Sequence, residues 1–155
     1  MGGHVGIEGD SAKVADFLKH GKLHLFAKDN NRHSRYNKGP VDSFYKTFET
    51  HPDSVKRAIV YVPVTQAQQQ KFDSIINSYM LETPYDYAFI GMRCAASAYE
   101  VLAQLEIFEP YSHSKTYWKI FYPKKLRKRL FKQAAKEGWV VDNCEGTCRR
   151  KWEQD

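Results

Sequence analysis

The chain lacks long hydrophobic runs. None of its 155 residues lies in an apolar stretch of about 18 or more, the length a membrane-spanning helix needs. The first residues also lack the basic-then-apolar pattern of a signal peptide. We therefore expect a soluble chain without a transmembrane segment, whose targeting sequence, if there is one, was removed from a longer precursor.

Cysteine is scarce as well, because the chain has three, too few for a disulfide framework. Cys144 and Cys148 bracket only three residues, so a local disulfide there would indicate an oxidising compartment. A metal site is the alternative, but it needs about four ligands and no second Cys/His pair lies nearby. Two unpaired thiols are the third interpretation. We expect no metal and no organic cofactor.

Positive charge is in excess and is unevenly distributed. The net charge is +6, and twelve of the 24 Lys and Arg residues lie in 115–151. Such a segment is either the solvated face of a helix or a surface for anions: nucleic acid, lipid headgroups or an acidic envelope polymer. No nucleic-acid recognition motif accompanies it, so a nucleic-acid partner would rest on charge alone.

The apolar pattern of the first half predicts mixed secondary structure. We expect a helix in 10–18, because Val14, Phe17 and Leu18 follow helical spacing, and a strand in 22–28, where polar and apolar residues alternate. Residues 29–40 are polar and predict a loop. Phe44, Tyr45 and Phe48 predict a short helical turn. The β-branched run 57–64 predicts a strand at the centre of the sheet.

The second half predicts three helices and an edge strand. Thr65 and Gln68 form a capping box that starts a helix ending near Leu81. Another helix begins at Cys94, and a basic one runs from Pro123 to Gly138. The aromatic segment 116–122 predicts a strand or a turn, and 139–141 an edge strand. Together these elements predict one α+β domain over residues 1–155, with a basic C-terminal helix and tail in about 115–155.

Cys94 is the leading candidate for a catalytic residue. It opens the apolar run Cys94–Leu102 directly after the turn-rich segment 83–87. Backbone N–H groups and the dipole at a helix start favour a thiolate over a thiol and can also bind an oxyanion. The residue equally lies on the apolar stripe of its helix, so a small buried hydrophobic side chain is the alternative interpretation.

A thiolate nucleophile also needs a proton partner, and two histidines in strand-like runs are candidates. His4 lies in Gly3–Ile7, and His24 lies between Leu23 and Leu25. Histidine is suited to this role because its ordinary pKa is close to neutral pH.

The order of these residues resembles that of the circularly permuted papain-like cysteine hydrolases. His4 comes on a strand, a further strand follows, and Tyr85-Asp86 precede Cys94 at a helix start. These enzymes are relatives of the NlpC-type cell-wall amidases, and the YiiX-like branch is the most similar. The resemblance covers about residues 3–108 and implies an antiparallel half-barrel sheet packed against the cysteine helix.

The resemblance also implies roles for individual residues. Cys94 matches the nucleophile, His4 the general base, and His24 the third, polar member, which belongs on the strand after the histidine strand. His20 and His33 are alternatives for that member. Tyr85, Asp86 and Tyr87 match the region that lines the substrate cleft. The alternative for those three residues is an aromatic turn packed under the helix.

The function implied is hydrolysis of an amide or ester bond, by a cysteine peptidase, amidase or acyl hydrolase. The substrate would be a peptide or acyl-amide, derived for example from peptidoglycan or lipid, in a bacterial envelope. The location would be periplasmic or secreted if a signal peptide was removed, and otherwise cytoplasmic. The competing hypothesis is a non-catalytic papain-like module that binds polyanions through its basic C-terminal helix.

Overall fold

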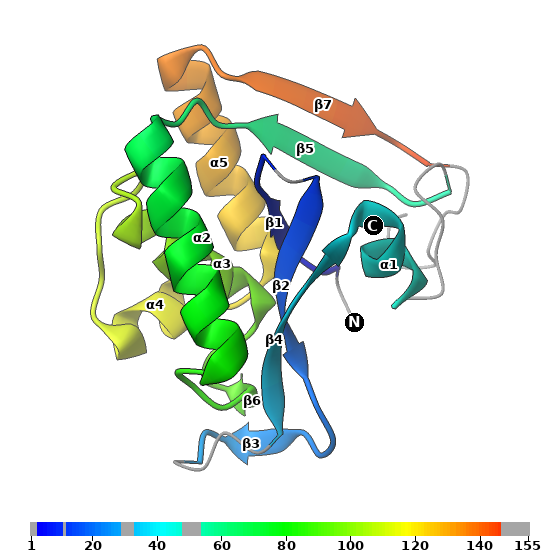
Figure 1. Ribbon diagram of the computed structural model, residues 1–155, viewed down its shortest axis with the longest axis vertical. Coiled ribbons are helices and arrows are strands. Elements are labelled where there is room, and N and C mark those ends of the chain that lie inside the picture. The colour runs from blue at the N-terminus through cyan, green and yellow to red at the C-terminus, as the bar shows by residue number, and fades with distance from the viewer. Residues whose placement is uncertain (1–2, 11, 29–32, 48–53, 147–155) are drawn as a thin grey trace.

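A computed structural model describes residues 3–10, 12–28, 33–47 and 54–146, and Figure 1 shows its fold. The strands are β1 (Gly6–Glu8), β2 (Lys13–Lys19), β3 (His24–Phe26), β4 (Ser34–Pro40), β5 (Arg57–Tyr61), β6 (Ala88–Ile90) and β7 (Val140–Cys144). The helices are α1 (Val41–Lys46), α2 (Gln66–Leu81), α3 (Cys94–Gln104), α4 (His113–Lys119) and α5 (Pro123–Glu137). The predicted α+β class is confirmed. The tail from 147 onward, with Cys148, lies outside the described residues.

The sheet that positions the N-terminal segment has three antiparallel strands in the order β1-β2-β4. Its middle strand, β2, is buried over residues 14–18. The helix α3 contacts β1 and β2, and α2 contacts β4. The short helix α1 lies on the other side of the sheet (Figure 1). Both faces of β2 are therefore covered by protein.

The helix predicted in 10–18 is wrong, because these residues form most of β2. A strand that is buried on both faces has apolar residues at nearly every position, and Val14, Phe17 and Leu18 then match helical spacing by chance. The loop predicted in 29–40 is also wrong in its second part. Ser34–Pro40 pairs with β2 along its whole length, since the neighbouring strand supplies hydrogen bonds that its polar sequence does not reveal.

The strand predicted in 57–64 is confirmed as β5, but its central position is wrong. It pairs with β7 in a separate two-stranded antiparallel sheet. Its apolar side chains are half-buried and the strand contacts α5, which explains its hydrophobic sequence without a central position. The predicted edge strand is β7. The strand expected in 22–28 is confirmed as the three-residue β3, parallel to β6.

The helices follow their sequence signals with one exception. The Thr65/Gln68 capping box precedes α2 as predicted, with the Thr65 N–H donating to the Gln68 side chain at 2.9 Å. The basic helix α5 ends at Gly138, which adopts a φ of 73°. The strand or turn predicted in 116–122 is wrong, because residues up to 119 belong to α4. None of the helices in the described ranges is both long and apolar enough to cross a membrane.

The segment of α4 is helical because one side of it is buried in the tertiary structure. Thr116 and Ile120, one helical turn apart, are both fully buried. Aromatic and β-branched residues favour strands only where a sheet is there to receive them. In this segment the packing against α3 decides the conformation instead.

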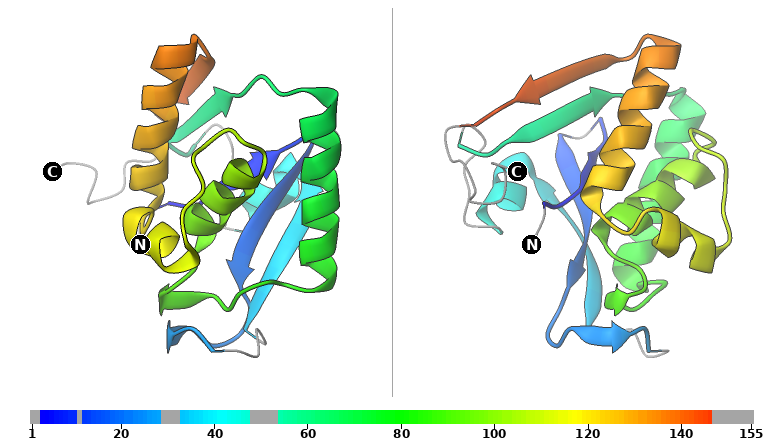
Figure 2. Two further views of the ribbon diagram at one scale, coloured as in Figure 1. Left: turned by 90° about the vertical axis from the view of Figure 1, so that its left-hand side faces the viewer. Right: turned by 180° about the vertical axis from the view of Figure 1, so that it is seen from behind.

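The helix α3 occupies the middle of the hydrophobic core. Eight of its eleven residues are buried. It contributes Ala96 and Val101 to one apolar cluster and Ala95, Ala98 and Tyr99 to a second. Figure 2 shows it between the β1-β2-β4 sheet and the chain that runs through α4 into α5. The position of its first residue, Cys94, is therefore fixed from several sides.

Removing a side chain between the sheet and the helices should lower stability strongly. Phe17 is 1% exposed and contacts the rings of Tyr36, Tyr85 and Tyr87. We expect Phe17→Ala to reduce the free energy of unfolding by about 3–5 kcal/mol, because a large cavity remains. Val140→Ala, at a position that is 65% exposed on β7, is the control and should cost less than about 0.5 kcal/mol. Urea unfolding followed by circular dichroism measures both, and equal losses would contradict the described packing.

Candidate active site

The thiol of Cys94 lies at the first position of α3 and is 5% exposed. The backbone N–H groups of Val5 and Ala95 donate hydrogen bonds to its sulfur. The preceding residue, Arg93, caps the helix without a side-chain hydrogen bond. The sulfur is thus surrounded by donors from the helix start and from the N-terminal segment.

The imidazole of His4 lies between Cys94 and a carboxylate. Its Nε2 atom is 2.8 Å from the Oδ2 atom of Asp16, and its ring also hydrogen-bonds the Cys94 thiol. Because Nε2 is occupied by Asp16, Nδ1 is the nitrogen that remains for the sulfur. The two side chains of the ion pair are 11% and 2% exposed. The ring of Phe44, from α1, contacts the His4 ring with centroids 5.6 Å apart.

Opposing effects act on the pKa of Cys94. Burial raises it, whereas the hydrogen bond and charge of His4 and the N–H groups of Val5 and Ala95 lower it. The net result is a pKa below the ordinary value of 9.0. The helix start and the histidine therefore favour the thiolate, as the sequence predicts.

The pKa of His4 changes in the complementary direction. Burial lowers it, but hydrogen bonds to Asp16 and Cys94 and the charges of both groups raise it to about 9. A raised histidine pKa next to a lowered cysteine pKa means that one proton is shared by a coupled pair. The arrangement therefore favours the imidazolium–thiolate form of the pair.

Asp16, a residue that the sequence analysis did not name, occupies the position next to His4 that was predicted for His24. It faces Gly6 across the β1–β2 pair, so it lies on the strand after β1, whereas His4 lies two residues before β1 and not on the strand predicted for it. The resemblance predicts the third member on that strand. The helical spacing in 10–18 hides this strand, so the sequence points to β3 as the next strand instead. The available signal was a single carboxylate inside the apolar run 14–18, since a buried charge needs a partner.

His24 has a different partner. Its Nδ1 atom hydrogen-bonds the carboxylate of Asp86, which also accepts the N–H of Lys28 at 3.0 Å. His24 and Asp86 are 8% and 1% exposed. This buried pair joins β3 to the segment that leads into β6.

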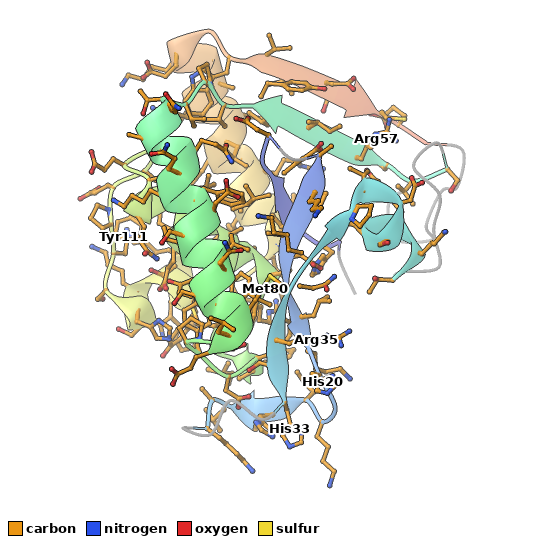
Figure 3. The ribbon with its side chains drawn as sticks, viewed as in Figure 1. His20, His33, Arg35, Arg57, Met80 and Tyr111 are labelled. Atoms are coloured by element: carbon orange, nitrogen blue, oxygen red, sulfur yellow. The ribbon has the colours of Figure 1, made fainter. Side chains whose placement is uncertain are left out.

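The alternatives His20 and His33 lie together at the β3 end of the molecule (Figure 3). The Nδ1 atom of His33 accepts the N–H of Lys22 at 3.3 Å, and its ring packs edge-on against His24. The backbone N–H of His20 donates to the carbonyl of His33. Both residues therefore organise the turn before β3.

Of the three residues predicted to line a cleft, Tyr87 alone contacts Cys94. Its hydroxyl accepts the backbone N–H of Cys94 and donates to the sulfur, and burial followed by the thiolate charge raises the pKa of Tyr87. Tyr85 is 7% exposed and packs among aromatic rings of the core. With Asp86 bonded to His24, the structure assigns Tyr85 and Asp86 to the interior, which was the alternative interpretation.

Two cavities bear on how a substrate reaches the thiol. A small one, of about 10 Å³, lies behind Cys94 and Asp16 among apolar side chains, which is room for about one water molecule. A larger one, of about 270 Å³, is lined by Tyr99, Tyr111 and His113 and does not include the thiol. Neither cavity gives a substrate-sized approach to the nearly buried Cys94 thiol.

Cys144 is half-buried at the end of β7. Its proposed partner Cys148 lies outside the described residues, so the disulfide and metal interpretations stay predictions. Within residues 3–10, 12–28, 33–47 and 54–146, no group of three or more His, Cys, Asp or Glu side chains could hold a metal ion.

No protein-family model, curated protein or solved structure matches this chain. The case for the site therefore rests on its own geometry.

Alkylation of Cys94 by iodoacetamide should begin below pH 9, because the thiolate reacts and its fraction rises with pH through a lowered pKa. In His4→Ala the favourable charge is lost while the sulfur stays buried, so we expect the midpoint to rise to about 8.5 or higher. The rate at Cys94 is followed by mass spectrometry in a Cys144→Ser/Cys148→Ser background. An unchanged midpoint in His4→Ala would contradict the coupling.

Two matched variants test whether Asp16 or His24 is the third residue of the candidate triad. Asp16→Asn keeps the shape of the side chain but removes the charge that favours imidazolium, so the same midpoint should rise. His24→Asn should leave it unchanged, with circular dichroism checking that both variants fold. If the midpoint of Cys94 alkylation rose only in His24→Asn, His24 rather than Asp16 would be the third residue of the triad.

Proposed function

We propose that this protein is a cysteine hydrolase that cleaves an amide or ester bond. The observation that carries the proposal is the hydrogen-bonded series Asp16–His4–Cys94, which ends in a thiol with a lowered pKa at a helix start. A nucleophile, a base within hydrogen-bonding reach and a group that orients the base are the three parts that acyl transfer by a thiol requires.

The reaction follows from the roles of the three groups. His4 holds the thiol proton, and the Cys94 thiolate attacks the carbonyl carbon of the substrate. His4 then gives its proton to the leaving amine or alcohol, which leaves an acyl group on the sulfur as a thioester. Water, deprotonated by His4, hydrolyses the thioester and restores the thiol. Asp16 keeps the imidazole oriented and stabilises its charge throughout.

The negative oxygen formed during attack needs donors beside the sulfur. The backbone N–H of Cys94 and the hydroxyl of Tyr87 bond each other in the free protein. A substrate oxygen that comes between them would accept from both, in place of the bonds that Tyr87 makes with the Cys94 N–H and sulfur. Preorganised donors of this kind are a large part of enzymatic rate acceleration.

The same arrangement supports the papain-like fold in its permuted form. A cysteine at the start of a buried helix packs against an antiparallel sheet, in which β2 carries the orienting residue and the segment just before β1 carries the base. In this chain the base precedes the nucleophile by 90 positions. Geometry rather than chain order defines such a triad. An envelope peptide or acyl-amide remains the substrate class that the resemblance implies.

Hydrolysis can be tested with p-nitrophenyl acetate and p-nitroanilides of short acyl groups. We expect release of nitrophenol from the ester and of nitroaniline from the anilides, together with a mass increase of one acyl group on Cys94. Cys94→Ser should lower the rate by about 10³-fold or more, because an alcohol is a far weaker nucleophile than a thiolate. Cys144→Ser is the control and should keep the parent rate. Labelling of Cys144 in place of Cys94, or equal rates in both variants, would refute the proposal.

Tyr87→Phe tests the oxyanion donor separately. We expect kcat to fall by about 10²-fold with little change in KM, because the bond strengthens in the transition state. Tyr79→Phe, another half-buried tyrosine of the aromatic core, should keep kcat. An increase in KM alone for Tyr87→Phe would show a binding role instead.

A further inference from the structure

A group of exposed apolar side chains surrounds Arg93, the residue before the candidate nucleophile. The guanidinium carbon lies 4.3 Å from the ring centroid of Phe121, 5.0 Å from that of Tyr122 and 5.5 Å from that of Phe89. Its Nη2 atom donates to the carbonyl of Phe121 at 2.7 Å. The ring of Trp118 stacks on Phe121. These contacts join side chains from β6, α4 and the segment before α5.

The β3–β6 pair extends this group by an aliphatic residue. His24 pairs with Ala88 and Phe26 with Ile90, so Leu25 and Phe89 both point to the opposite face of the two strands. We call the five side chains the apolar patch: Leu25, Phe89, Trp118, Phe121 and Tyr122. Figure 2, in its left panel, shows β3, β6 and the α4–α5 junction on the same side of the molecule.

The exposure of the apolar patch has no explanation in the packing of the fold. Trp118 is 61% exposed, Leu25 59%, Tyr122 49% and Phe89 42%. A single exposed apolar residue is ordinary, but a contiguous group drawn from several elements indicates an interaction surface.

The charge around the apolar patch identifies the kind of partner. Residues 110–136, which include Trp118 and Tyr122, contain nine Lys or Arg and no Asp or Glu. The other two contributing segments, 22–28 and 87–99, also lack acidic residues. Lys119, Lys124 and Lys125 are exposed directly beside the aromatic residues in sequence. A partner with dense negative charge is favoured, and a second copy of this basic chain is not.

Among anionic partners, the apolar side chains favour lipid over nucleic acid. Nucleic acid would use the rings for stacking but would leave Leu25 against water. At a membrane surface, tryptophan and tyrosine rings lie at the headgroup level, aliphatic side chains enter the acyl region, and lysines contact anionic headgroups. All three kinds of side chain are present here.

We propose that the apolar patch and the lysines beside it bind the surface of an anionic lipid bilayer. Docking in this orientation brings Arg93, and with it the start of α3, to the lipid surface. The proposal does not depend on the reaction assigned to Cys94, since binding needs no catalysis.

The first experiment measures binding to vesicles of phosphatidylcholine with and without phosphatidylglycerol. A Trp139→Phe/Trp152→Phe background leaves Trp118 as the sole tryptophan, and brominated lipid acyl chains should then quench its fluorescence. We expect binding to the mixed vesicles, with quenching, and much weaker binding to phosphatidylcholine alone. Binding without quenching of Trp118 would overturn the proposal, because the aromatic side would then face water.

Matched variants distinguish vesicle binding through the apolar patch from nonspecific attraction between a basic protein and an anionic surface. Trp118→Ser and Phe89→Ser should each weaken vesicle binding about tenfold or more, whereas Val140→Ser on β7 should not. Lys124→Glu/Lys125→Glu should weaken it about 30-fold or more, from about fivefold per basic residue removed. Lys132→Glu/Lys136→Glu, toward the other end of α5, should weaken it less.

Cys94→Ser should bind vesicles like the parent protein, so failure of the proposed chemistry and failure of membrane binding are distinguishable. Two other results would overturn the proposal. One is a concentration-dependent dimer that Trp118→Ser abolishes, without vesicle binding. The other is binding to single-stranded DNA that the same variants lose, again without vesicle binding.

Discussion

The buried ion pair between His4 and Asp16 is the constraint on which the site depends. A carboxylate that is 2% exposed inside an apolar strand is costly unless a charged or hydrogen-bonding partner reaches it. His4 is that partner, and the cost is smallest when the imidazole is protonated. The proton that stabilises the buried Asp16 is the proton whose presence favours a thiolate at Cys94. The stability of the buried Asp16 carboxylate and the ionisation of the Cys94 thiol therefore depend on one interaction.

The surrounding elements keep that interaction in register. Pairing of Gly6 with Asp16 sets β1 against β2 and fixes where the N-terminal segment runs. A Cβ at Gly6 would lie 2.4 Å from Val14 and 2.9 Å from Phe44, so glycine is needed for the strands and α1 to approach this closely. The apolar helix α3 supplies the opposite wall, because its first turn is held between two hydrophobic clusters. Asp16 and Cys94 thus lie on a strand and a helix, and His4 lies two residues before β1.

Sequence patterns predicted the parts of the fold that depend on local chemistry. The capping box of α2, the proline and glycine that bound α5, and the helix at Cys94 were all confirmed, because each signal lies within a few residues of the feature it specifies. The errors concern features set by distant partners. The strand β2 was predicted as a helix because it is buried on both faces, and β5 was placed centrally because its apolar residues pack on α5. The candidate site divides in the same way. Cys94 and His4 were found from their own surroundings, whereas Asp16 required the pairing of β1 with β2.

The aromatic segment before α5 lies close to the residues that flank the candidate site. Cys94 is nearly buried, and the cavity beside it has room for about one water molecule. Arg93, the residue before it, contacts Phe121 and Tyr122, and Pro123 follows these with a ring 3.8 Å from where a Cβ on Gly3 would lie. The aromatic segment before α5 therefore adjoins both the residue before the nucleophile and the residue before the base. A large partner that covers this segment would lie against the residues that precede both members of the candidate pair, so a surface contact there and access to the thiol depend on the same few residues.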